Sequence, residues 1–227
     1  MPRAARQAPG GMVFHVLNRG VGRMRLFEKD ADYAAFERIL AETLEVRPMR
    51  ICAWCLMPNH WHMVLWPKED GDLAAFMQRL SITHVRRWQE HRHKVGEGHL
   101  YQGRYKSFPI ERDEHFLTVC RYVERNPLRA ELVRRAEDWR WSSLWRRKQD
   151  DEEARSLLAD WPVEGTRDWV RRVNQAETAG ELDALRRCVT RGRPYGGPVW
   201  TERTTRRLGL ENTFRSRGRP PKARDDA

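Results

Sequence analysis

The sequence has no long hydrophobic run and few cysteines. No apolar stretch approaches the roughly 20 residues that a membrane-spanning helix needs. The basic residues near the start are not followed by an apolar segment, so we expect no secretory signal. The four cysteines, Cys52, Cys55, Cys120 and Cys188, are too few and too scattered for a disulfide framework. These absences predict a cytoplasmic protein without a membrane partner.

Acidic residues are also in deficit. The chain of 227 residues has 43 Lys and Arg against 32 Asp and Glu, a formal net charge of +11. Between Arg186 and Arg224 there are twelve cations against only Glu202 and Glu211, an excess of 10, so the C-terminal part is a basic arm. Such an excess favours a polyanionic partner, and nucleic acid is the leading candidate.

The hydrophobic spacing predicts an alternation of strands and helices. Strands are expected at residues 12–18, 49–57, 60–66 and 99–110, and helices at residues 30–46, 71–91 and 113–125, the last capped by Asp113. The order β-α-β-β-α-β-α indicates an α+β, ferredoxin-like fold, an antiparallel sheet with helices packed on one face. The polar run at 149–153 predicts a boundary between a catalytic domain, 1–148, and a helical, basic C-terminal region, 149–227. Within that region, residues 157–185 have a helical pattern.

A pair of histidines stands out on the third predicted strand. Because side chains alternate along a strand, His60 and His62 are expected on one face and Trp61 on the other. Two imidazoles so placed can converge on one divalent cation, although such pairs also arise by chance. Tyr122 and Asn126, four residues apart, are expected to share a helix face and to offer a phenol nucleophile with a carboxamide ligand. Together these groups suit metal-assisted phosphodiester cleavage through a covalent tyrosine intermediate.

Five segments carry a resemblance to a known family. They are residues 9–20 (PGGMVFHVLNRG), 55–62 (CLMPNHWH), 99–106 (HLYQGRYK), 121–130 (RYVERNPLRA) and 138–143 (DWRWSS). In this order they resemble the REP-associated tyrosine transposases, relatives of the single-tyrosine HUH transposases. The resemblance covers about residues 2–145, and Trp61 keeps the middle position of the triplet hydrophobic.

The resemblance implies a set of roles. His60 and His62 would be metal ligands, Tyr122 the nucleophile and Asn126 the third ligand, where many relatives have glutamine or glutamate. The cofactor would be a divalent metal, Mg or Mn. The substrate would be single-stranded DNA with short hairpins, the repetitive extragenic palindromes (REP elements). The expected enzyme is a metal-dependent tyrosine transposase, acting as a monomer or a homodimer through a 5′-phosphotyrosine intermediate.

Other residues allow alternative interpretations. Cys52 and Cys55 with the histidine pair could form a zinc site, but three-residue spacing on a strand sends the two thiols to opposite faces, which favours ordinary buried cysteines. Tyr101 and Tyr105 compete with Tyr122 as nucleophiles. We interpret these two tyrosines, with the flanking Arg104 and Lys106, as DNA-binding residues that stack or pack near the DNA.

A tetrapeptide, Arg-Gly-Arg-Pro, occurs twice in the basic arm, at residues 191–194 and 217–220. An extended Arg-Gly-Arg segment can lie in a DNA minor groove, so we predict DNA contacts by four arginines, Arg191, Arg193, Arg217 and Arg219. A periodic segment, Trp200–Leu210, lies between the copies. A merely solvated tail is the alternative.

Two rival functions remain at the level of sequence. One is a non-catalytic protein that sequesters or regulates repeat DNA, because a basic arm supports affinity whether or not cleavage occurs. The other, weaker hypothesis is RNA processing, because tyrosines on a sheet can stack on bases.

Overall fold

The computed structural model describes residues 7–149 and 152–215. Its centre is a four-stranded antiparallel sheet in the order β2-β3-β1-β4, built from β1 (Val13–Arg19), β2 (Arg50–Met57), β3 (His60–Trp66) and β4 (Lys106–Ile110). With α1 (Asp30–Val46) after β1 and α2 (Asp72–His91) after β3, this is the predicted ferredoxin-like connectivity. The expected fold class is confirmed.

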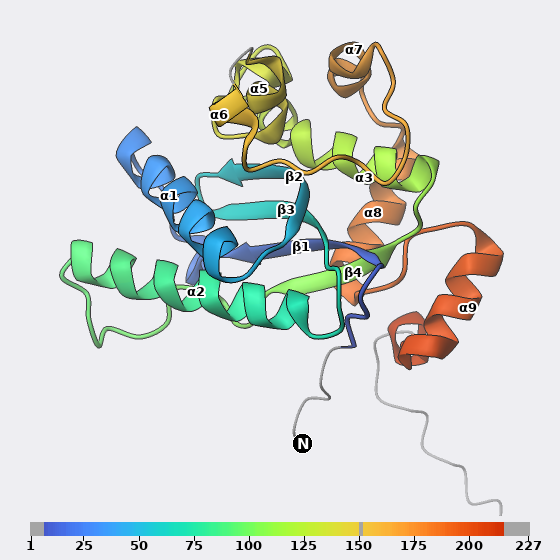
Figure 1. The fold of residues 1–227 in the computed structure, drawn as a ribbon, viewed down its shortest axis with the longest axis horizontal. Helices are drawn as coiled ribbons and strands as arrows, with labels where there is room; N and C mark the ends of the chain where they lie inside the picture. Colours follow the sequence, from blue (N-terminus) through green and yellow to red (C-terminus); the bar gives the residue numbers. More distant parts are fainter. Residues whose placement is uncertain (1–6, 150–151, 216–227) are drawn as a thin grey trace, which may run out of the picture.

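Helices α1 and α2 cover one face of the sheet (Figure 1). Their apolar stripes, among them Phe36, Leu40, Phe76 and Leu80, pack on the side chains that alternate strand residues send to that face, such as Trp61. None of these side chains is more than a few per cent exposed, and this layer holds the larger aromatic residues of the core.

Helices cover the opposite face as well, so the prediction of helices on one face is wrong. Helix α3 (Glu114–Glu124) crosses that face, followed directly by the single turn α4 (Asn126–Arg129) (Figure 1). The carboxylate of Asp113 caps α3 by accepting the backbone N–H of His115 at 2.8 Å, as predicted. Because nearly every residue of α3 from Phe116 onward is buried, this helix is fixed by packing on both of its sides.

Further helices follow α4. They include α5 (Ser143–Lys148), α6 (Glu152–Arg155), α7 (Trp169–Asn174), α8 (Ala179–Arg191) and α9 (Pro198–Leu208). Of these, α5, α7 and α8 contribute buried residues to the core on the α3 side of the sheet. Trp169, Val173 and Leu185 belong to the same buried cluster as Phe116 of α3 and Phe108 of β4. Residues on both sides of position 148 therefore share one core, and the predicted division into regions 1–148 and 149–227 stays a prediction. The interval 157–168 is not helical, so the predicted helix over 157–185 is shorter and divided.

Two local predictions on the strands are corrected. The last strand begins at Lys106 rather than at residue 99, because Leu100 and Tyr101 turn into the α1–α2 core instead of alternating between faces. In β2 the pairing with β3 shifts between Ile51 and Ala53, a β-bulge at Cys52. The bulge sends Cys52 and Cys55 to the same face, toward α3, although three-residue spacing predicted opposite faces. All four cysteines are buried and free, as expected for structural thiols.

No helix of the described residues is both long enough and apolar enough to cross a bilayer.

Candidate active site

The histidine pair lies at the start of β3, on the face that α3 covers. The rings of His60 and His62 have centroids 5.0 Å apart, and Trp61 points to the opposite core with no exposed surface. The predicted alternation of these three side chains is therefore confirmed. His62 is 3% exposed, and His60 is half-buried at the edge of the same face.

Hydrogen bonds at Nδ1 determine which nitrogen of each imidazole is free. Nδ1 of His60 donates to Oδ1 of Asn59 at 2.6 Å, because an amide oxygen can only accept. The amide of Asn59 is itself oriented by donating from Nδ2 to the carbonyl of Arg23 at 3.3 Å. Nδ1 of His62 lies 2.9 Å from Nε2 of His15, a buried histidine of β1. With Nδ1 engaged in this way, each member of the pair can present an Nε2 lone pair to a metal ion.

Burial keeps these imidazoles neutral. It lowers the pKa of His60 to about 4, with smaller contributions from the positive charges of Arg19 and Arg129. It lowers the pKa of His62 well below its usual value, and that of His15 to about 3. A metal ion binds the unprotonated imidazole, so the donor set fits a divalent cation at neutral pH.

Tyr122 lies against the histidine pair. Helix α3 carries its ring into edge-on contact with His62, centroids 5.9 Å apart, and with His15, centroids 6.2 Å apart. The side chain is 9% exposed, and it lines a groove of about 640 Å³. The structure therefore brings the predicted nucleophile and the predicted ligand pair together from two different elements.

The same groove is basic. Its cationic lining residues come from three parts of the chain: Arg19 ends β1, Arg104 and Lys106 precede or begin β4, and Arg186 lies on α8. None of the described residues that line it is acidic. A groove with these charges beside a tyrosine attracts a polyanionic strand. Arg104 and Lys106, which were predicted as DNA contacts, line this groove, and so does Arg186, which the sequence indicated only as part of the basic arm.

Asn126 is 7% exposed and begins α4. Its Oδ1 accepts a hydrogen bond from Arg129 at 2.6 Å, and its Nδ2 is buried without a partner in the described part of the chain. An amide oxygen has a second lone pair, so this contact leaves one site for a metal. Ligation by Asn126 stays a prediction.

The remaining predicted DNA contacts fall in different surroundings. The side chain of Tyr101 is in the core, where its hydroxyl accepts from Nε1 of Trp61 at 3.0 Å and lies 2.6 Å from Nδ1 of His84. This burial does not support a stacking role for Tyr101. Tyr105 is half-buried and packs against the α1–α2 core.

The first Arg-Gly-Arg-Pro copy is not extended. Arg191 is the last residue of α8, and Gly192 ends the helix in the left-handed conformation, with φ of 76°. Arg193 donates to the carbonyls of Thr213 at 2.8 Å and Phe214 at 3.2 Å, so its guanidinium holds the C-terminal turn. Because the guanidinium of Arg193 is engaged by these carbonyls, Arg191 is the better candidate of the two for a DNA contact. Arg217 and Arg219 lie outside the described residues.

Two other features, a side-chain cluster and a hollow, lie apart from the basic groove. The side chains of Glu111, Asp113 and His115 have ligand atoms within 4.8 Å of one another, the one such group among the described residues. Asp113 is occupied in capping α3, and Glu111 accepts the backbone N–H of Gly197 at 2.7 Å.

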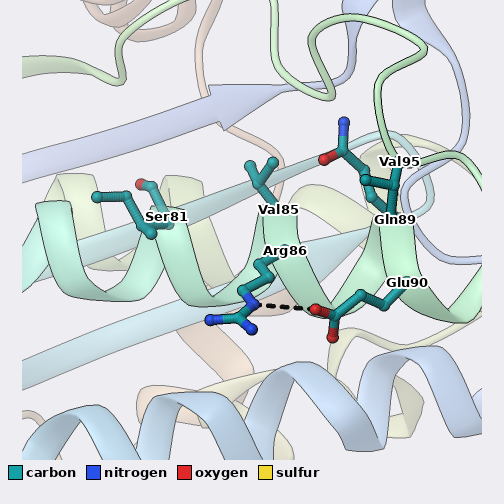
Figure 2. A pocket seen from close by; sticks show the side chains of 7 residues that line it. Ser81, Val85, Arg86, Gln89, Glu90 and Val95 are labelled. Atoms are coloured by element: carbon teal, nitrogen blue, oxygen red, sulfur yellow. Dashed lines mark hydrogen bonds and ion pairs between the residues drawn. The ribbon is translucent and has the colours of Figure 1, made fainter.

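A hollow of about 410 Å³ lies along α2, on the other side of the sheet from His62 (Figure 2). Figure 2 shows Arg86 and Glu90 paired on it, 2.9 Å apart, and Val85 and Val95 beside them. This hollow contains none of the predicted site residues.

The chain is similar to known transposases. A family model described as IS200-like transposase matches residues 10–126. The REP-associated tyrosine transposase of Escherichia coli K12 is 24% identical over 143 residues, which are 60% of this chain and 78% of the relative. A Haemophilus influenzae protein described as the same kind of transposase is 25% identical over 134 residues, 56% of this chain and 74% of the relative.

A solved structure of a REP-associated tyrosine transposase bound to a REP hairpin superposes with a TM-score of 0.54 at 20% identity. The match covers 78% of this chain and 93% of that one. It supports the fold, and with the matches above it confirms the resemblance that the five sequence segments predicted.

Proposed function

The chain belongs to the family of IS200-like transposases, and on that premise we propose that it cleaves and rejoins single-stranded DNA carrying REP-type hairpins. The observation that carries this proposal is the edge contact between the rings of Tyr122 and His62 beside a basic groove. The candidate nucleophile contacts a candidate metal ligand and lines a groove whose charge suits a polyanionic strand. Similarity to a transposase described as REP-associated, and to one whose structure is bound to a REP hairpin, supports the same substrate class.

The proposed reaction begins at Tyr122. Its hydroxyl oxygen attacks a backbone phosphorus, the phenol loses its proton, and the bond to the 3′ oxygen breaks as that oxygen gains a proton. The 5′ phosphate stays esterified to the tyrosine. Attack by the 3′ hydroxyl of another strand then reverses these changes, and the phosphodiester is restored without ATP. Strand transfer therefore fits this nucleophile better than hydrolysis.

The chain's own groups hold and orient the reacting atoms. His60 and His62, with Asn126 as the predicted third ligand, would hold a divalent metal, Mg or Mn. Such an ion would polarise the scissile phosphate and offset charge on the leaving 3′ oxygen. His15 and Asn59 fix the ring orientations of the two histidines. The groove cations, with Arg191 and the arginines of the second Arg-Gly-Arg-Pro copy, would bind the phosphates of the strand.

The test uses hairpin DNA labelled at its 3′ end, incubated with protein and Mn²⁺. Because the tyrosine keeps the 5′ phosphate of the downstream fragment, a 3′ label should follow the protein through a denaturing gel, and a 5′ label should not. Tyr122→Phe, His60→Ala and His62→Ala should form no adduct. Tyr33→Phe is the matched control, since Tyr33 lies in the α1–α2 core on the other face, and it should react like the wild type.

An adduct in Tyr122→Phe, or none in the wild type, would contradict the proposal. Tight DNA binding that persists in a chelator without any cleavage would instead favour the non-catalytic binding protein. Stronger competition by RNA hairpins than by DNA would favour RNA processing.

A further inference from the structure

Arg129 contacts both Tyr122 and Asn126. Its guanidinium carbon lies 4.3 Å from the centroid of the Tyr122 ring, over the ring face, and its Nη2 donates to the carbonyl of Tyr122 at 3.2 Å. The same nitrogen donates to Oδ1 of Asn126 at 2.6 Å. We propose that Arg129, locked in place by Glu177, is the positioning residue that fixes the nucleophile and the amide beside it. This inference rests on the proposed function.

Glu177 comes from a distant part of the chain. It lies between α7 and α8, beyond residues 10–126, where the family model matches. Its side chain is only 2% exposed and binds two arginines, with Oε1 2.6 Å from Nη1 of Arg129 and Oε2 3.0 Å from Nε of Arg125. The C-terminal region thus supplies a buried anion that holds the end of the nucleophile helix.

The geometry leaves Tyr122 little freedom. One side of its ring faces the Arg129 cation, while the imidazoles of His15 and His62 meet the ring edge-on. A planar guanidinium donates in fixed directions, so an arginine held by Glu177 through Nη1 has its Nη2 aimed at Asn126 and at the Tyr122 carbonyl. A lysine in its place would supply charge without these directions.

The chemical consequence follows from the sensitivity of in-line attack to distance. A displacement of about 1 Å in a reacting group can lower a rate by roughly 100-fold. Without the Glu177 carboxylate, the guanidinium would lose its orientation, and both the phenol and the Asn126 amide would sample other positions. DNA affinity should change little, because Glu177 is buried and does not belong to the groove.

The experiment measures the single-turnover rate of adduct formation at saturating hairpin DNA, together with the DNA dissociation constant and the melting temperature. Glu177→Gln and Arg129→Lys should each slow adduct formation by about 10- to 100-fold. The dissociation constant of Glu177→Gln should stay within about twofold of the wild type. Rates are measured well below the melting temperature of each variant, so that unfolding does not contribute to the loss of adduct formation.

A matched control and a double variant separate positioning from general stability. Glu114→Gln removes another ion pair between the nucleophile helix and the C-terminal region, from Arg172 of α7 to Glu114 of α3 at 2.6 Å, which does not involve Tyr122. It should leave the adduct rate unchanged. If Glu177 acts through Arg129, adding Glu177→Gln to Arg129→Lys should cause no further loss, whereas a merely structural role would make the two losses multiply.

The proposal would be overturned if Glu177→Gln formed the adduct at the wild-type rate, or if Glu114→Gln slowed adduct formation as much as Glu177→Gln does. It would also be overturned if the rate losses of Glu177→Gln and Arg129→Lys multiplied in the double variant. Failure of the wild type to form any adduct would instead contradict the proposed function itself, so the two failures are distinguishable.

Discussion

Nε2 of His15, on the first strand, lies 2.9 Å from Nδ1 of His62 on the third. This contact makes a core histidine the partner of a proposed metal ligand. Because β1 and β3 are neighbours in the sheet, the bond is built into the strand pairing and does not depend on a loop. An outer partner of this kind fixes the tautomer and the direction of the ligand ring.

We therefore predict that His15→Phe weakens metal binding. The phenyl ring fills a similar space but cannot accept from His62, so the affinity for Mn²⁺ should fall by about 10- to 100-fold. Isothermal titration with Mn²⁺ measures the change without reference to activity. His99→Ala, at an exposed position, serves as the control, and an unchanged affinity in His15→Phe would argue against the role.

Removing charge from the groove should weaken DNA binding in a salt-dependent way. Arg186 and Lys106 approach the same groove from α8 and β4. If each neutralises one phosphate, Arg186→Ala and Lys106→Ala should each reduce the slope of log affinity against log salt by about 0.7. Fluorescence anisotropy with hairpin DNA at several salt concentrations provides the slopes. Arg38→Ala, exposed on α1 at the other face, should leave the slope as it is.

The buried His84 should make the protein sensitive to acid. Burial lowers the pKa of His84 to about 3, below the value of 6.5 that applies when the chain is unfolded. Below pH 6.5 the unfolded state gains a proton that the folded state does not, so stability falls as pH falls, by about 1.4 kcal/mol per pH unit from this group. Above pH 6.5 it contributes no pH dependence.

Urea unfolding in a chelator at pH 7.5, 6 and 5 would measure this effect. His84→Asn retains a group that can bond to the Tyr101 hydroxyl but does not titrate, so its stability should depend less steeply on pH. Parallel curves for the two proteins would show that His84 is not responsible.

Glu124 connects the nucleophile helix to the C-terminal helices. Its carboxylate is fully buried and accepts from Oγ of Ser143 at 2.5 Å and from Nε1 of Trp169 at 2.6 Å. Glu124→Ala leaves the buried N–H of Trp169 without its acceptor, while Oγ of Ser143 can still donate to the carbonyl of Trp54 at 3.2 Å, so the change should cost about 1 to 3 kcal/mol of unfolding free energy. Glu45→Ala, exposed on α1, should change it by less than about 0.5 kcal/mol. Chemical denaturation distinguishes these values, and a small loss for Glu124→Ala would mean that water replaces the carboxylate.

The spacing of apolar residues and the residues that begin or end a helix were sufficient to predict the helices around the sheet. The helix at 30–46 was predicted with its observed bounds, because its apolar residues recur every three or four positions and Pro48 follows it closely. The shared face of His60 and His62 follows from strand alternation alone, and that part of the candidate site could be predicted. The bulge at Cys52 could not, since it depends on how β2 pairs with β3 rather than on either strand by itself.

The residues that support the site were not predictable for the same reason. His15 reaches His62 only through the register of β1 on β3, and Glu177 reaches Arg129 across 48 positions of sequence. The sequence predicted Tyr101 as a residue that stacks on DNA, yet its hydroxyl contacts Trp61 and His84 in the core. In each case the deciding partner lies far away along the chain, beyond the range of local pattern.

The burial of all four cysteines has a practical consequence. Burial raises the pKa of Cys52 and of Cys188 to about 12, and it raises the pKa values of Cys55 and Cys120 well above the ordinary range. At neutral pH the folded protein should therefore react slowly with maleimides. A single new thiol at Val199, which is 79% exposed on α9, would accept a fluorophore without prior removal of the native ones. Energy transfer from a dye there to a labelled oligonucleotide could then follow the strand as it enters and leaves.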